Sequence, residues 1–315
     1  MIQDKKDRFE SRIRNTVVEL VRHSTQPQEI LPAGLHSPTD MAPREIYLKI
    51  GPITFTIESR TRLLTELLYR ELGASIGTKE ESSRRLICDS QCAMYAKSFN
   101  PFEKPSVEPR SHYWVLSSKQ VEASYFPRYR LAWAALPENA HSLRCLLQML
   151  FTLWMEEQQG LLVSGSTVVH HGMSYLLLEE TNHQQADRPT PIQPTLLGKE
   201  ISMLGLSEKG ECYAYSTPLG DDGLEKRPAE GAPLQGIFLI GRDSTDSPRV
   251  MSLEEASYSL RRSTLCFSKA GEVFERINER TQEILGKIKA YRTAANGSED
   301  FWKIGPSQNA PAPEM

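Results

Sequence analysis

The sequence predicts a mixed α/β fold. Short apolar runs of strand length flank turn residues, as in Ile46–Ile57 around Gly51-Pro52. A long segment begins after Pro137 and ends at Gly160, and it is apolar on most sides, which is typical of a helix inside a core. Helical patterns return near the end of the chain. Together these patterns indicate a compact mixed domain.

Composition narrows the function classes. The 315 residues include 37 Lys and Arg against 40 Asp and Glu, for a net charge of −3. This balance excludes binding to nucleic acid or to an anionic membrane through a broad positively charged surface, although a local basic patch remains an alternative. The longest apolar stretch, Leu143–Met155, is too short and too interrupted to span a bilayer. The five cysteines are an odd number without a signal peptide, which argues against a disulfide framework. We expect a cytosolic-type protein.

Both ends of the chain differ from its middle. Residues 1–23 show a mostly helical apolar spacing, and residues 24–44 contain four prolines and predict a linker. The first helix is either a partner-binding arm or a helix packed on its own domain, and we favour the second interpretation. Residues 296–315 have the composition of a disordered tail.

Residues 45–160 predict a subdomain of strands and helices. After the first hairpin, Ser59 is expected to cap a helix that runs through Leu68 to Leu72 and is closed by Gly73. Four strand-like runs follow, at Leu86–Ala93, His112–Ser117, Val121–Phe126 and Arg130–Ala135. Pro137-Glu138-Asn139 then introduces the long apolar helix.

Residues 161–295 predict a second set of strands followed by helices. We expect a strand over Leu161–Val169, a turn at His170-His171-Gly172 and a strand over Ser174–Leu178. Three prolines then forbid a regular helix within residues 179–195. Further strands are expected at Leu196–Leu206, Glu211–Tyr215 and Leu234–Ile240, and helices at Leu253–Leu265 and Glu272–Tyr291.

Cysteine and histidine residues offer weak metal signals. Cys88 and Cys92 are spaced like one half of a zinc site, but a second pair is needed and none exists. Small packed side chains are the better interpretation. His170-His171 suggests a metal or catalytic pair, yet neighbours on an extended strand point to opposite faces, and Gly172 favours a hairpin turn.

The remaining motifs are incomplete. Asp221-Asp222-Gly223 suits either a divalent-metal loop or an ordinary surface turn, and we favour the turn. Ser164-Gly165-Ser166 lacks the full nucleophile elbow. Neither a dinucleotide-binding nor a phosphate-loop glycine motif occurs in the chain. We therefore expect no catalytic residue, no cofactor and no metal.

The order of elements over roughly residues 46–293 resembles the HPr serine kinase/phosphorylase-like family in its kinase-type C-terminal domain. The resemblance depends on the strand pair in Leu161–Leu178, on Ser216-Thr217-Pro218, on Ala232-Pro233-Leu234 and on the apolar run Gly236–Ile240. It implies a P-loop-type sheet core, preceded by a strand/helix subdomain and followed by C-terminal helices. Members of the family place a glycine-rich phosphate loop directly after the second strand of the pair.

This chain departs from the family at both parts of the active site. The phosphate-loop position contains instead Glu179, Glu180, Thr181, Asn182 and Arg188, and no glycine or lysine occurs from Met173 through Leu197. The family also ends its next strand with two aspartates, which act as base and magnesium ligand. Here the nearest position has Lys199 and Glu200, so a cation stands where a magnesium ion would bind.

The losses predict a degenerate kinase, a pseudokinase. We expect a regulatory, accessory or assembly protein that binds another protein or peptide, and the family's oligomeric habit implies self-association. No nucleic acid and no membrane span are expected. One alternative is an active phosphotransferase whose nucleotide site is rebuilt from Arg188, Lys199 and Asp221-Asp222. Another is a structural subunit of a larger complex, docked through residues 1–44 and 294–315.

Overall fold

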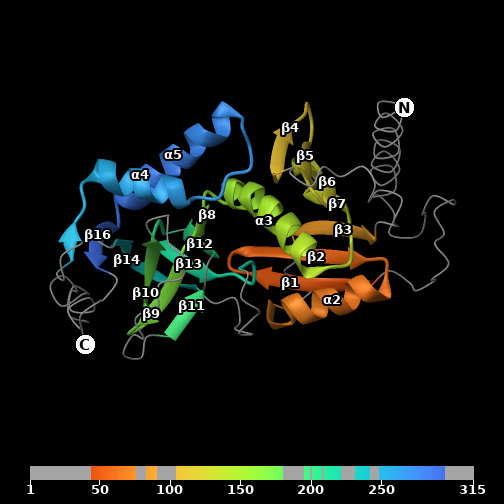
Figure 1. Cartoon of the computed structure of the whole chain (residues 1–315), viewed down its shortest axis with the longest axis horizontal. Helices are drawn as coiled ribbons and strands as arrows, with labels where there is room; N and C mark the ends of the chain where they lie inside the picture. The colour runs from red at the N-terminus through yellow and green to blue at the C-terminus, as the bar shows by residue number, and fades with distance from the viewer. Residues whose placement is uncertain are drawn as a thin grey trace. The chain divides into compact units, whose positions relative to one another are not determined.

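The computed structural model describes residues 44–75, 83–90, 104–179, 195–198, 201–207, 209–220, 231–241 and 248–294. The chain divides into two compact units, residues 1–42 and 43–315, and every described residue lies in the second unit. The predicted N-terminal helix and C-terminal tail lie outside the described residues. Within them, the predicted mixed α/β fold is confirmed: two sheets pack against helices (Figure 1).

The first sheet has seven described strands, in the order β1-β2-β3-β7-β6-β5-β4. Strands β2, β3 and β7 run parallel, and the other neighbours are antiparallel. Their bounds are β1 Arg44–Ile50, β2 Ile53–Ser59, β3 Arg84–Ser90, β4 Ser106–Pro109, β5 Trp114–Ser118, β6 Val121–Phe126 and β7 Leu131–Leu136. Two single-turn 3-10 helices accompany it, Gly73–Ser75 and Pro127–Tyr129.

Helices α2 (Arg62–Leu72) and α3 (Ala140–Glu157) bury their apolar sides in the core of the first sheet. Phe55 of β2 lies 5.7 Å from Phe151 and 5.1 Å from Trp154 of α3, measured between ring centroids. Side chains alternate along a strand, so Phe55 lies on the face of the sheet that packs in the core and Thr56 lies on the opposite face. On β1 and β2 this second face is polar, whereas on β3 and β7 it also has Ile87 and Trp133.

The second sheet has nine described strands, with β11-β9-β10-β14-β13-β12-β8 as its main order and β15 and β16 beyond β14. Strands β10, β14 and β16 are parallel. Helices α4 (Leu253–Ser263) and α5 (Gly271–Leu285) share a core with this sheet. The strand bounds are β8 Leu161–Ser164, β9 Ser166–His170, β10 Met173–Glu179, β11 Thr195–Gly198, β12 Ile201–Leu206, β13 Cys212–Ser216, β14 Gly231–Gly241, β15 Arg249–Val250 and β16 Lys289–Ala294.

The segment between α4 and α5 joins the two sheets. The Leu265 amide donates to the Leu162 carbonyl of β8 at 2.8 Å. Two residues later, the Phe267 carbonyl accepts from the Val107 amide of β4 at 2.9 Å. A single extended connector is therefore hydrogen-bonded to one strand of each sheet.

The first hairpin, the strand Val121–Phe126 and the long helix ending before Gly160 are confirmed. Two other expectations are wrong. Ser59 does not cap α2, because it pairs with Arg44 and Cys88 as the last residue of β2; the cap is Thr61. Leu161–Val169 is not one strand, because the strand is interrupted at Gly165 and continues as a second strand.

Crowding explains the break at Gly165. A Cβ there would lie 2.8 Å from the Leu177 carbonyl oxygen of β10, so the backbone approaches β10 too closely for a side chain. On one side of the break β8 pairs with β12, and on the other β9 pairs with β10 and β11. The break therefore moves the chain from one end of the sheet to the other.

The last predicted helix is too long. It ends at Leu285 rather than Tyr291, with Gly286 as its C-cap. Residues Lys289–Ala294 form β16 instead, and Tyr291 stacks on Phe238 of β14 with ring centroids 5.1 Å apart. The expected strand Leu196–Leu206 is likewise described as two strands, β11 and β12. The short strands β4 and β15 were not expected from the sequence.

Candidate functional site

The carboxyl ends of parallel strands are where open α/β sheets bind ligands. In the second sheet, β10 and β14 end together, since Glu179 pairs with Ile240, and Gly241 pairs with Ala294 of β16. The side chain of Glu179 is exposed at this edge. The carboxylate of Glu179 thus ends β10, and the resemblance described above predicts a phosphate loop directly after this strand.

Strand β11, which precedes the second predicted position in the sequence, points toward the same edge. Strand β11 is antiparallel to β9, which is antiparallel to β10, so β11 and β10 point the same way. Gly198, the last residue of β11, pairs with Thr167 of β9. One strand lies between β11 and β10, so Gly198 is about 10 Å from Leu176 of β10, which precedes Glu179 by three residues. The described ends of β10 and β11 therefore point toward one edge of the sheet.

The other predicted site residues lie outside the described residues. These are Glu180, Thr181, Asn182, Arg188, Lys199 and Glu200, together with Asp221-Asp222. Of the predicted set, the structure therefore places Glu179 alone, and it places Gly198 beside the second position.

Behind this edge the sheet is closely packed. Phe238 of β14 lies between Tyr175 and Tyr291, with ring centroids 6.0 and 5.1 Å away. Burial raises the pKa of both tyrosine hydroxyls. Thr167 donates to the Ser202 hydroxyl at 2.7 Å, and Ser202 donates to the Gly165 carbonyl at 3.0 Å. These buried groups satisfy one another, which is typical of a stable scaffold.

Two helices begin at the carboxyl edge of the first sheet. Strands β2, β3 and β7 end there, α2 follows β2, and α3 follows β7. The Thr61 hydroxyl accepts from the Leu64 amide at 3.2 Å and caps α2. Asn139 Oδ1 accepts from the Ser142 amide at 2.9 Å and caps α3. Each helix start therefore uses the chain's own side chain as its acceptor.

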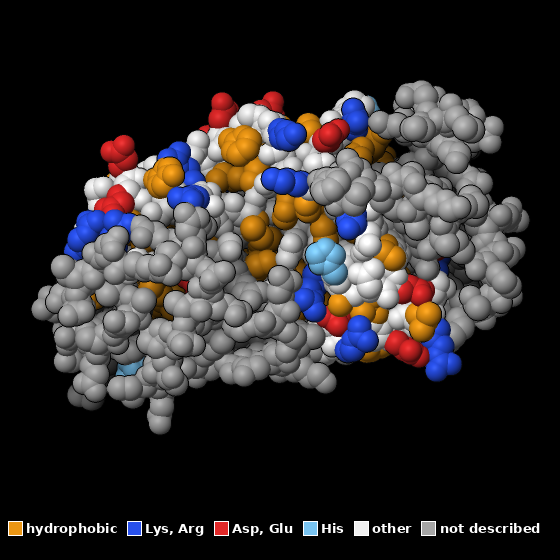
Figure 2. Space-filling view, viewed as in Figure 1, with side chains coloured by type: hydrophobic (Ala, Val, Ile, Leu, Met, Phe, Trp, Pro, Cys, Tyr) orange, Lys and Arg blue, Asp and Glu red, His pale blue; other side chains and the backbone are white. Residues whose placement is uncertain are grey.

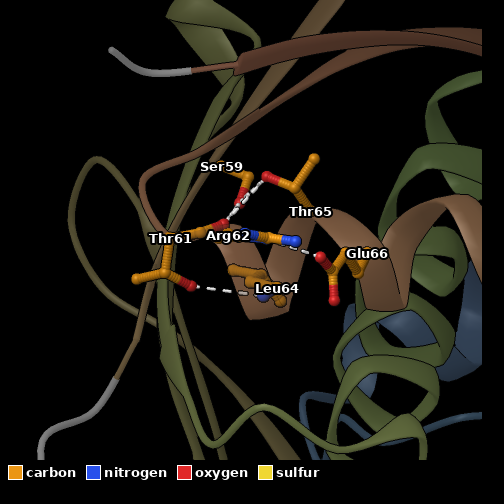
Figure 3. Close-up of polar contacts among 6 residues, drawn as sticks. All are labelled: Ser59, Thr61, Arg62, Leu64, Thr65 and Glu66. Atoms are coloured by element: carbon orange, nitrogen blue, oxygen red, sulfur yellow. Dashed lines mark hydrogen bonds and ion pairs between the residues drawn. The ribbon is translucent and has the colours of Figure 1, made fainter. Parts of the chain in front are cut away.

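Hydroxyl groups fill the first turn of α2 (Figure 3). The Ser59 and Thr65 hydroxyls lie 3.1 and 2.8 Å from the Thr61 carbonyl oxygen, and Thr65 Oγ1 is 3.1 Å from Ser59 Oγ. On the outer side of the same turn, Arg62 and Glu66 form an exposed ion pair at 2.7 Å. The cluster fixes the start of the helix.

Two carboxylates border this first edge. Thr61 donates to Glu138 Oε1 at 2.5 Å, across from the end of β2. Asp89 near the end of β3 lies 3.6 Å from an Arg60 guanidinium nitrogen. A phosphate placed here would meet Glu138 and capped helix starts, and the Arg60 guanidinium is already shared by Asp89 and Glu58. Sequence reasoning missed this edge; its signal was Pro137-Glu138-Asn139, a capping segment before a long helix.

Cys88 and the segment His170–Gly172 can be placed in the structure. Cys88 is fully buried, and burial raises the pKa of its thiol, which disfavours the nucleophilic thiolate. Cys92 lies outside the described residues. His171 and Gly172 adopt φ of 50° and 78°, so the favoured interpretation of a hairpin turn is confirmed. The described part of the chain contains no group of three side chains suited to a metal.

Apolar side chains also reach the surface of α4 and α5. Leu253, Tyr258 and Phe274 are each about half exposed, at 57%, 58% and 47%. In the view of Figure 2, hydrophobic side chains in this region alternate with basic and acidic ones. Scattered apolar side chains of this kind are ordinary on protein surfaces.

Comparisons with protein-family models and with curated proteins return no match to this chain. Within the described residues, no helix has the length and apolar content needed to cross a lipid bilayer.

Proposed function

We propose that the chain is a non-catalytic, HPr-kinase-like protein that works by binding another protein or peptide, as a regulatory, accessory or assembly factor. One observation carries the proposal: both carboxyl edges present carboxylates. Glu179 is exposed at the edge of the second sheet, and Glu138 and Asp89 border that of the first. Nucleotide phosphates require amide donors and cations at such an edge.

The electrostatic cost of a bound nucleotide supports this function. Two like unit charges 4 Å apart repel by about 4 kcal/mol at an effective dielectric constant near 20. Solvent screens Glu179 because it is exposed, but a nucleotide brings several negative charges. The sequence from Met173 through Leu197 offers no lysine and one arginine, Arg188, to offset them.

The intact scaffold supports a binding role. The strands around Glu179 remain buried, with Leu176, Leu178 and Ile237 each exposed by 2% or less. A well-packed core without phosphate-binding residues is what we expect of a protein whose role is to bind partners through its surface. Self-association through these surfaces belongs to the same proposal.

Phosphoryl transfer from γ-labelled ATP with magnesium tests the function. We expect the full chain to transfer no more label, to itself or to added peptide, than a reaction without protein. Transfer that is abolished in Lys199→Ala or Arg188→Ala would overturn the proposal in favour of a rebuilt phosphotransferase. Deleting residues 1–44 tests the structural-subunit alternative, which requires that the deletion abolish partner capture.

A further inference from the structure

A groove of about 310 Å³ lies on the face of the first sheet opposite its core. Its floor includes Thr56 of β2, which pairs with Tyr47 of β1 on one side and with Arg85 of β3 on the other. Paired residues share one face of a sheet, so these three side chains belong to the face opposite Phe55 and the core. Tyr129 and Arg130 complete the wall.

The charges of the groove are unevenly matched. Arg85 pairs with the buried carboxylate of Glu58 and lies 3.7 Å from Glu45, which also lines the groove. Arg130 is exposed, and no carboxylate of the described residues forms an ion pair with it. Arg128, also exposed, precedes it by two residues. Arg130 therefore adds a positive charge to this wall of the groove, and Arg128 adds another close to it.

The backbone of Arg130 is held in an unusual conformation. Its φ is 49°, in the left-handed region that favours glycine. The conformation is fixed because the Arg130 amide donates to the Pro127 carbonyl at 3.0 Å and its carbonyl accepts from the Arg85 amide at 2.9 Å. Glycine would fit this backbone with less strain. An arginine at this strained position is explained if its guanidinium binds a ligand.

We infer that this groove binds an acidic peptide segment of a protein partner. A carboxylate of the segment pairs with the Arg130 guanidinium, whose planar fork suits a carboxylate. A neighbouring apolar side chain packs on the rings of Tyr129, which is 45% exposed, and Tyr47. Arginine and tyrosine are the residue types that dominate binding hot spots. The inference rests on the proposed function and names the partner's chemistry.

Fluorescence anisotropy with the full chain tests the site. The probe is a labelled random copolymer of Glu and Tyr, compared with a copolymer of Lys and Tyr. We expect the acidic copolymer to bind and the basic one not to bind. Arg130→Gly should weaken binding by about tenfold, a loss of about 1.4 kcal/mol, and it should fold at least as well because glycine suits φ of 49°.

Arg262→Gln is the matched control, because it removes one positive charge from an exposed position on α4. It should bind the acidic copolymer as the wild type does. Equal binding of both copolymers, wild-type affinity in Arg130→Gly, or an equal loss in Arg262→Gln would overturn the inference. These outcomes leave the labelled-ATP result unchanged, whereas phosphoryl transfer would overturn the proposed function without touching the groove.

Discussion

The Thr61 hydroxyl donates to Glu138 Oε1 at 2.5 Å while it accepts from the Leu64 amide at 3.2 Å. One side chain thus caps α2 and ties it to the segment between β7 and α3, 77 residues away in sequence. The same contact places a carboxylate at the edge where the first sheet would otherwise be open to an anion.

Thr61→Ala should lower the free energy of unfolding by about 1–2 kcal/mol, because it removes the cap and the anchor for Glu138. Urea denaturation measures the change. Thr61→Ser keeps the hydroxyl and should stay close to wild type. An equal loss in both variants would show that the methyl group, not the hydrogen bonds, is what matters.

Gly172→Ala should destabilise the protein by about 1 kcal/mol. The cause is backbone strain alone, because φ is 78° and a Cβ there would meet no atom within 4 Å. Gly73→Ala is the control, since Gly73 has equal space but φ of −57° at the end of α2. Alanine at position 73 should be neutral or stabilising. Thermal unfolding should show a lower midpoint for Gly172→Ala and no decrease for Gly73→Ala if the hairpin turn is as described.

The connector between α4 and α5 should resist hydrogen exchange. The amides of Leu265 and Val107 are hydrogen-bonded between the connector and the two sheets, and they should exchange more slowly than Gly210, which is bonded within a surface turn. Phe267→Ala should speed exchange at both, because Phe267 packs against the core of the first sheet. Exchange at Leu265 as fast as at Gly210 would contradict this connection.

Glu156 predicts a pH effect. Its ion pair with Arg276, 2.5 Å long, favours the charged form, but burial outweighs it, and the pKa of Glu156 is raised above its ordinary value of 4.5. The folded state therefore keeps this proton after the unfolded chain has lost it, so stability falls as the pH rises above 4.5. The charge of Glu156 thus costs stability at neutral pH.

Glu156→Gln should accordingly raise the midpoint of thermal unfolding at pH 7, and the gain should vanish below about pH 4. Glu275→Gln, at an exposed position of α5 next to Arg276, removes an equal charge and should not show the pattern. A destabilised Glu156→Gln at pH 7 would mean that attraction to Arg276 exceeds the cost of burial.

Local patterns predicted much of the fold. Alternating apolar residues located β1, β2 and β6, and the length of its apolar pattern located α3. The errors arose where tertiary contacts override local pattern. Tyr291 fits a helical stripe but pairs as a strand beside Phe238, and Gly165 breaks a continuous apolar run because β10 lies against it.

The sites divide in the same way. Glu179 could be placed from the sequence because it directly follows the predicted strand Ser174–Leu178, and it is the last residue of β10. The groove could not, since Tyr47, Arg85 and Arg130 come from three segments whose register the sequence does not specify. The pairing of Thr61 with Glu138 likewise depends on two helices starting at one edge.

Calorimetric titration of the full chain with ATP, ADP and pyrophosphate, with and without magnesium, tests the central claim most directly. The carboxylates at both edges predict no binding heat and no thermal shift at millimolar nucleotide. Binding at micromolar affinity, about −8 kcal/mol, would contradict the account and favour an active nucleotide site.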